Sequence, residues 1–270
     1  MAQIRVIGGD ADGNLKRADA AIRAAAAQGC QAVVLPECLD LGWTHPSARA
    51  AATAIPGPRT AALARAAAEA GVYVAAGLVE SAGDRLYNAA VLLDDSGRMV
   101  LHHRKINELT IAHDLYALGR SLAVAETPFG AVGLAICADL FPSSLALGHA
   151  LCRMGARLIL SPCAWAVEAD HDQMRQPYGA IWREAYGELA RLYDVAVVGV
   201  SGVGSLDAGP WQGRQCIGCS LAVGPAGLLA QGPYGECAEA VLVVRVPLLA
   251  TPAAGTAIAP LLRARGYAGP

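Results

Sequence analysis

The spacing of apolar and polar positions along the chain predicts alternating helices and strands. Residues 14–28 place Leu15, Ala18 and Ile22 on one helix face, and Gly29 ends this predicted helix. Short runs rich in β-branched residues predict buried strands between the helices, an alternation that is typical of layered α/β proteins. The same reasoning predicts helices at residues 60–70, 143–154 and 178–193, and strands at residues 3–7, 32–35, 72–78, 86–93, 99–103, 123–126, 132–136, 158–160 and 195–200.

No linker divides the chain into separate parts. A turn at residues 94–97 joins two of the predicted strands as a β-hairpin, and residues 215–246 predict a β meander. No Pro/Gly/Ser-rich segment and no internal repeat interrupts this series. We therefore expect a single domain over residues 1–270.

Composition and charge exclude several classes of protein. With 54% hydrophobic and 16% charged residues, the chain can bury enough apolar surface to fold, so disorder is excluded. No run of about 18 apolar residues is present, and residues 1–10 lack the features of a secretory signal, so we expect a soluble, cytoplasmic protein with no membrane partner. Lys and Arg (21) nearly balance Asp and Glu (23), which predicts no nucleic-acid partner.

Eight cysteines in a long chain without an export signal are expected to be free thiols that pack as small hydrophobic residues. Cys216 and Cys219 have the spacing of a redox motif or of half a zinc site. No second pair with suitable spacing follows, so we expect a chance pair and no metal site. A redox or zinc-binding protein built on these two thiols is the alternative.

Three predicted strands end in side chains with catalytic chemistry, namely Glu37, Lys105 and Cys137. Open α/β sheets place ligands beyond the carboxyl ends of their strands. A thiol becomes a strong nucleophile when a base removes its proton or a positive charge stabilises the thiolate, and a carboxylate with an ammonium group would supply both.

A Cys–His pair is the commoner way to activate a thiol. His102, His103, His113 or His149 could therefore take the place of the carboxylate. Spacing alone leaves this choice open.

Five blocks that occur in order along nearly the whole chain resemble the nitrilase, or carbon–nitrogen hydrolase, superfamily. The blocks are Leu35-Pro36-Glu37, Arg104-Lys105-Ile106, the segment 133–139 around Cys137 with Pro142 downstream, the segment 160–165, and Gly218-Cys219-Ser220 leading to the 224–227 turn.

This resemblance implies an α/β fold built as a four-layer α-β-β-α sandwich. It implies a Glu–Lys–Cys triad formed by Glu37, Lys105 and Cys137, with no metal or organic cofactor. Glu37 would be the general base and Cys137 the nucleophile. Lys105 and the backbone N–H of Ala138 would stabilise the oxyanion.

The resemblance also implies a fourth active-site residue between the lysine and the cysteine. Glu108 is the nearer candidate, although its spacing of three residues from Lys105 is short for the family, and His113 is the other candidate. Trp43, His45 and Trp165 are candidates for the substrate pocket together with Ala138 and His113, because they follow Glu37, Cys137 and a predicted strand closely.

The function predicted on this basis is hydrolysis of a non-peptide C–N bond in a small linear amide or N-carbamoyl compound through a thioester. A nitrile substrate is the alternative within the same mechanism, and a non-catalytic protein that kept the fold is a third hypothesis. The run after the cysteine, Leu140-Phe141-Pro142-Ser143, departs from the family, so pocket contacts cannot be transferred from one subfamily. The resemblance implies a homodimer or higher homo-oligomer.

Overall fold

Two β-sheets form the centre of the molecule, as seen in a computed structural model that describes residues 1–248, 261 and 264–266. The first sheet has the strand order β2-β3-β4-β5, in which β2 and β3 are parallel and the other neighbours are antiparallel. Its strands are β2 (Ala32–Val34), β3 (Tyr73–Ala82), β4 (Arg85–Leu93) and β5 (Met99–Arg104).

The second sheet has the order β14-β13-β10-β8-β7-β6. Its three central strands, β10, β8 and β7, run parallel to one another, and β13, β14 and β6 are antiparallel to their neighbours. The strands are β6 (Val124–Thr127), β7 (Gly130–Leu134), β8 (Leu158–Cys163), β10 (Ala196–Ser201), β13 (Leu221–Gly224) and β14 (Gly227–Gln231).

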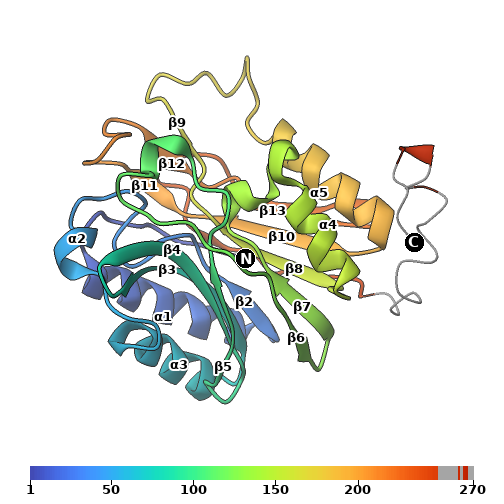
Figure 1. Ribbon diagram of the computed structural model, residues 1–270, viewed down its shortest axis with the longest axis horizontal. Coiled ribbons are helices and arrows are strands. Elements are labelled where there is room, and N and C mark those ends of the chain that lie inside the picture. Colours follow the sequence, from blue (N-terminus) through green and yellow to red (C-terminus); the bar gives the residue numbers. More distant parts are fainter. Residues whose placement is uncertain (249–260, 262–263, 267–270) are drawn as a thin grey trace.

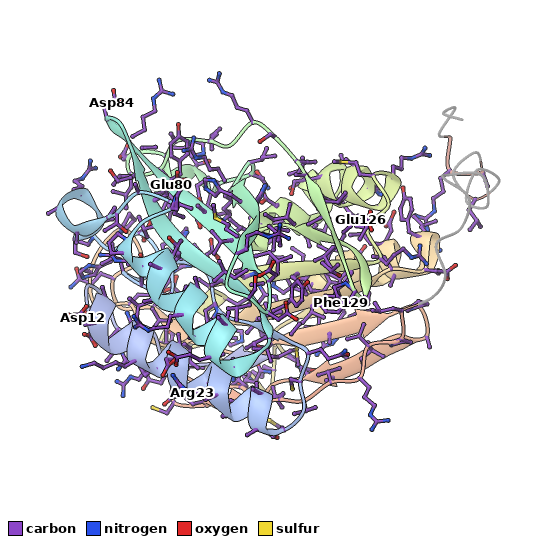
Figure 2. All side chains as sticks on the ribbon, turned by 90° about the horizontal axis from the view of Figure 1, so that it is seen from below. Asp12, Arg23, Glu80, Asp84, Glu126 and Phe129 are labelled. Carbon is purple, nitrogen blue, oxygen red and sulfur yellow. The ribbon has the colours of Figure 1, made fainter. Side chains whose placement is uncertain are left out.

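Helices cover the outer face of each sheet (Figure 1). Helices α1 (Ala11–Ala27) and α3 (Pro58–Ala70) pack side by side over the first sheet, and α4 (Ala146–Arg153) and α5 (Ala180–Tyr193) cover the second. Side chains fill the space between the layers, with α1 marked on the outside by Asp12 and Arg23 (Figure 2). The layer order is α-β-β-α, which confirms the expected sandwich.

One apolar cluster joins the two sheets. It includes Val34 and Leu92 from the first sheet and Leu134 and Leu160 from the second, each no more than 4% exposed. Because burial of apolar surface is the main favourable contribution to folding, this contact fixes the sheets against each other. The loops that follow the strands are therefore held at defined positions.

Helices α1 and α3 begin two to three residues earlier than the apolar pattern alone predicts, because a polar residue and a proline start them, whereas α4 and α5 begin two to three residues later than predicted. Asp10 accepts a hydrogen bond from the backbone N–H of Gly13 (3.1 Å) and caps α1, while Pro58 occupies the first turn of α3. The left-handed backbone at Gly29 (φ 76°) follows the end of α1, as predicted.

Short elements account for the remaining differences from the sequence pattern. The strand predicted at residues 3–7 is only β1 (Ala2–Gln3), with Arg5 in an isolated bridge to Val203. The other short elements are α2 (Ala48–Ala51), η1 (Thr110–Ala112), η2 (Cys137–Leu140), η3 (Pro142–Ser144), β9 (Ala166–Val167), β11 (Val203–Ser205), β12 (Gln215–Ile217) and β15 (Ala240–Val241).

No helix in the described residues is long and apolar enough to cross a membrane.

Candidate active site

Glu37, Lys105 and Cys137 line one cavity, although 100 residues separate the first from the last in the sequence. Glu37 follows β2, Lys105 follows β5, and Cys137 begins η2 just after β7. The cavity has a volume of about 50 Å³. Its other lining residues are Trp43, Leu109, Ala138, Phe141, Ala164, Trp165, Ala166, Tyr178, Trp182 and Trp211.

A buried ammonium group lies between two buried carboxylates. Lys105 Nζ donates hydrogen bonds to Glu37 Oε1 (2.7 Å) and to Glu108 Oε1 (3.0 Å). The side-chain amide of Asn88, on β4, donates to the same two carboxylates, at 2.6 Å to Glu37 and 2.9 Å to Glu108. Ionic groups survive burial only when they are paired and hydrogen bonded, and here each carboxylate receives both kinds of partner.

The two carboxylates and the burial of the site have opposite effects on the pKa of Lys105. Burial works to lower the pKa of its ammonium group, but the charges of Glu108 and Glu37 outweigh it and hold the pKa of Lys105 well above its usual value. Lys105 is therefore a permanent positive charge on the cavity wall.

Burial raises the pKa of Glu37 above its usual 4.5, and the neighbouring Glu108 charge adds to this, while Lys105 opposes it. A carboxylate with a raised pKa is a stronger base than an exposed one. Glu37 is thus suited to take a proton inside this cavity.

Cys137 is held in an unusual backbone conformation. Its φ of 43° lies in the left-handed region, which costs a non-glycine residue about 1–2 kcal/mol. Its backbone N–H donates to Ser161 Oγ (3.2 Å) on β8. Strain of this kind is concentrated at functional sites, where surrounding contacts compensate for it.

The Cys137 thiol is protonated in the resting site. Burial, a hydrogen bond with Cys163 and the charge of Glu37 raise the pKa of Cys137 well above its usual value, against the effect of Lys105. Reaction at this thiol therefore requires a base at the moment of attack.

Asp139 joins the segment that carries Cys137 to the segment that follows Lys105. Its fully buried carboxylate accepts hydrogen bonds from the backbone N–H groups of Ile136 (2.9 Å), Ile106 (3.0 Å) and Asn107 (2.7 Å). His103 Nε2 lies 2.8 Å from Oδ2 of the same carboxylate. Burial acts to raise the pKa of Asp139. The contact with His103 and the backbone hydrogen bonds outweigh burial and hold this pKa below its usual value.

Aromatic side chains form much of the cavity wall. Trp165 stacks on Trp182 with the ring centroids 4.9 Å apart, and the Trp182 indole N–H donates to the Tyr178 hydroxyl (3.1 Å). On the other side, Trp43 packs edge-on against Trp211 at 4.8 Å. Of the predicted pocket residues, Trp43, Ala138 and Trp165 thus line the cavity.

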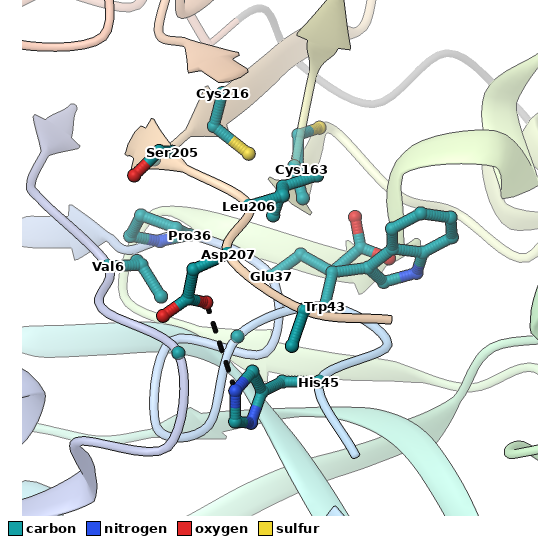
Figure 3. A pocket seen from close by; sticks show the side chains of 15 residues that line it. Val6, Pro36, Glu37, Trp43, His45, Cys163, Ser205, Leu206, Asp207 and Cys216 are labelled. Atoms are coloured by element: carbon teal, nitrogen blue, oxygen red, sulfur yellow. Dashed lines mark ion pairs between the residues drawn. The ribbon is translucent and has the colours of Figure 1, made fainter. Parts of the chain in front are cut away.

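His45 lines a second, smaller cavity of about 20 Å³, which Glu37 also borders (Figure 3). Its Nε2 is 3.8 Å from an Asp207 carboxylate oxygen, and its Nδ1 is 2.7 Å from Ser47 Oγ. Glu37, Trp43 and Ala164 line both cavities. His45 therefore lies beside the site but does not line the cavity that contains Cys137.

The structure places the two candidates for the fourth residue differently. Glu108 is buried and bonded to Lys105, whereas His113 is exposed and its Nε2 lies 3.2 Å from the backbone oxygen of Glu108. Of the other histidines, His103 contacts Asp139, His102 contacts Glu80, and His149 lies near Tyr193, so none lines the cavity.

Cys216 and Cys219 are buried free thiols. Cys216 lines the smaller cavity, and burial raises its pKa to about 12, which makes it a poor metal ligand or nucleophile at neutral pH. Among the residues that the structure describes, no group of His, Cys, Asp or Glu has the arrangement of a metal site.

Sequence reasoning missed Asn88, which bridges the two carboxylates. A signal was present, because Asn88 is an amide in the middle of a strand, directly before the apolar run of residues 89–93. A polar side chain at such a position must have a buried partner.

Comparison with known proteins settles the family. The family model described as carbon–nitrogen hydrolase matches residues 1–253. The chain belongs to the carbon–nitrogen hydrolase family.

Curated relatives of this carbon–nitrogen hydrolase include amidases and nitrilases. It is 33% identical over 162 residues to the omega-amidase NIT2 of Danio rerio, a match that covers 56% of this chain and 58% of the relative. It is 36% identical over 157 residues to a nitrilase of Pyrococcus abyssi, again covering 56% and 58%. The chain thus spans less than two thirds of the length of these relatives.

Among solved structures, a variant of the amidase from Nesterenkonia sp. AN1, with acrylamide added at its active-site cysteine, superimposes with a TM-score of 0.75 at 22% identity. The match covers 91% of both chains. The NitN amidase of the same organism gives a TM-score of 0.74 at 22% identity, also over 91% of both chains. These likenesses establish the fold of the carbon–nitrogen hydrolase described here.

Proposed function

We propose that this chain is an amidase that hydrolyses the C–N bond of a small linear amide or N-carbamoyl compound through a thioester on Cys137. One observation carries the proposal. Glu37 and the buried Lys105, which is bonded to both Glu37 and Glu108, form part of the wall of the cavity that contains the strained Cys137.

In the first step, Glu37 takes the thiol proton while Cys137 Sγ attacks the carbonyl carbon of the amide. The new S–C bond forms as the carbonyl electron pair moves to the oxygen. Lys105, whose raised pKa keeps it charged, and the backbone N–H of Ala138 stabilise this oxyanion. A general base is needed because the resting thiol is protonated.

In the second step, the C–N bond breaks as protonated Glu37 returns its proton to the leaving nitrogen. Ammonia or an amine departs and a thioester remains on Cys137. Water then attacks the thioester, Glu37 takes a proton from that water, and the thiolate leaves and is reprotonated as the acid is released. Glu37 is thus base and acid in turn, while Glu108 keeps Lys105 charged.

Family membership and the relatives support amide hydrolysis as the reaction class. The omega-amidase relatives and the amidase with the same fold act, by their names, on amides. The cavity volume of about 50 Å³ favours a small substrate.

The test is intact-mass analysis of the protein after brief exposure to a panel of small amides, ureido acids and nitriles, together with an assay for released ammonia. We expect an acyl adduct on Cys137 and ammonia release from at least one amide or ureido compound. The Cys137→Ala variant, with unchanged circular dichroism, is the control and should show neither. Ammonia release by that variant at the wild-type rate would refute the proposal.

A further inference from the structure

The wall of the cavity carries little charge apart from the groups assigned to the reaction. Its charged side chains, among the described residues, are Glu37 and Lys105. The remainder of the wall consists of aromatic, aliphatic and alanine side chains together with Cys137. A substrate bound here therefore meets charge only at the reacting end.

The charge of Lys105 is already matched. Its ammonium group is bonded to the carboxylates of Glu37 and Glu108, so the three groups carry no excess positive charge for a substrate. A carboxylate on the acyl chain would leave water and enter a site where negative groups equal or outnumber positive ones. Burial of an unpaired charge is strongly unfavourable.

One arginine lies against the wall from outside. The guanidinium of Arg214 lies 4.2 Å from the centroid of the Trp211 ring and forms an ion pair with Glu168. The Trp211 ring is itself part of the cavity wall. Arg214 does not line the cavity and its charge is balanced by Glu168, so it does not offer a free cation to a bound acid.

Apart from Glu37 and Lys105, the wall carries neutral hydrogen-bond donors. The indole N–H groups of Trp43 and Trp165 are buried and have no hydrogen-bond partner in the described structure. The Tyr178 hydroxyl accepts from Trp182 and keeps its own proton to donate. Neutral donors of this kind suit an uncharged oxygen acceptor, such as the carbonyl of a second carboxamide.

The volume of about 50 Å³ favours a small acyl chain. We propose that this cavity selects amides whose acyl chain is short and uncharged, and that it rejects amides whose acyl chain carries a carboxylate. This inference rests on the proposed function and assigns it a substrate class.

The decisive comparison uses succinamide and succinamate, which have nearly the same shape but differ by one negative charge at neutral pH. Steady-state hydrolysis of both is measured at pH 7.5, with ammonia as the readout. We expect kcat/KM for succinamide to exceed that for succinamate by at least about 100-fold, because the carboxylate finds no cation to pair with. Equal values, or a preference for succinamate, would overturn the inference.

A matched pair of variants tests whether charge is the cause. Phe141 is half-buried on the wall, where its ring lies 4.9 Å from the Trp182 ring. Phe141→Arg adds a cation at this position, and Phe141→Met is the neutral control of similar length. We expect the preference for succinamide to fall at least 10-fold in Phe141→Arg and to persist in Phe141→Met. An unchanged preference in Phe141→Arg would contradict a selection based on charge.

Binding to the Cys137→Ala variant separates this inference from the proposed function. Calorimetric titration with succinamide and succinamate measures discrimination without turnover. If wild type releases ammonia from no amide or ureido compound of the panel but the variant binds succinamide at least 10-fold more tightly than succinamate, the proposed reaction fails and the charge selection stands. If the variant binds succinamate as tightly as succinamide, the inference fails whatever the reaction is.

Discussion

The buried carboxylate of Asp139 offers the sharpest test of how the site is held together. Asp139→Asn keeps the size of the side chain but replaces one oxygen by an NH2 group. In the native structure one oxygen accepts from the backbone N–H groups of Ile106 and Asn107, and the other accepts from Ile136 and faces His103. An asparagine has one acceptor oxygen, so it can accept the hydrogen bonds of only one of these two groups of donors.

The expected cost follows from the number of bonds that are lost. In either orientation the new NH2 group faces at least one backbone N–H donor, so one or two hydrogen bonds to a charged acceptor disappear at a site without solvent. Such bonds are worth about 1.5–3 kcal/mol each. We therefore expect the free energy of unfolding to fall by about 1.5–6 kcal/mol.

The assay is urea unfolding at pH 7 followed by circular dichroism, for wild type, Asp139→Asn and the control Asp84→Asn. Asp84 is exposed at the tip of the β3–β4 hairpin (Figure 2), so its variant should change the unfolding free energy by less than about 0.5 kcal/mol. A loss below about 1 kcal/mol in Asp139→Asn would refute the assignment of Asp139 as a structural link between the two segments.

The difference in unfolding free energy between wild type and Asp139→Asn should change with pH in a defined direction. Because the pKa of Asp139 is lowered by folding from its usual 3.8, the stability that its charge contributes is fully present above about pH 4 and is lost as the pH falls through the folded value. The gap between wild type and Asp139→Asn should therefore narrow on acidification. A gap that widens would contradict the charged state assigned to Asp139.

Three further predictions concern catalysis. Glu37→Gln should lower kcat/KM for amide hydrolysis about 10²–10⁴-fold with unchanged circular dichroism, because the general base is lost; full activity would exclude that role. The pKa of Glu37 is raised and its basic form is the active one, so a profile of kcat/KM from pH 4 to 9 should fall on acidification with a midpoint above 4.5; a midpoint below 4.5 would contradict this. Asn88→Ala should lower both the unfolding free energy, by about 1–3 kcal/mol, and kcat/KM, because Glu37 and Glu108 each lose a buried donor; denaturant unfolding and steady-state kinetics measure the two losses.

The layered fold was predictable because it depends on periodicity, which is local in the sequence. Helix α1 and strands β4 and β5 lie within a few residues of their predicted ranges, since burial on one face dictates their patterns. The strand predicted at residues 3–7 was wrong in length, because Ala2 and Gln3 pair with Val241 and Ala240, far away in the chain. No local pattern contains that information.

The candidate site was predictable in its residue types but not in its contacts. A lysine at a strand end, such as Lys105, is exposed in most proteins, and only the fold reveals that it is 2% exposed between Glu37 and Glu108. The choice between Glu108 and His113 also depended on the path of the loop after β5. Chain spacing could not decide it, because the loop has no regular structure before residue 110.

The charge balance of the site explains why the proposed reaction needs both carboxylates. When Glu37 takes the thiol proton, it loses its negative charge, and an equal charge appears on the oxyanion. Lys105 thus exchanges one anionic partner for another, and no additional charge is buried in the transition state. Glu108 stays bonded to Lys105, and its charge helps to hold the pKa of Lys105 above its usual value. If Glu108 were absent, protonation of Glu37 would leave the ammonium group without a buried partner until the oxyanion had formed. The second carboxylate therefore holds Lys105 charged and in place during proton transfer.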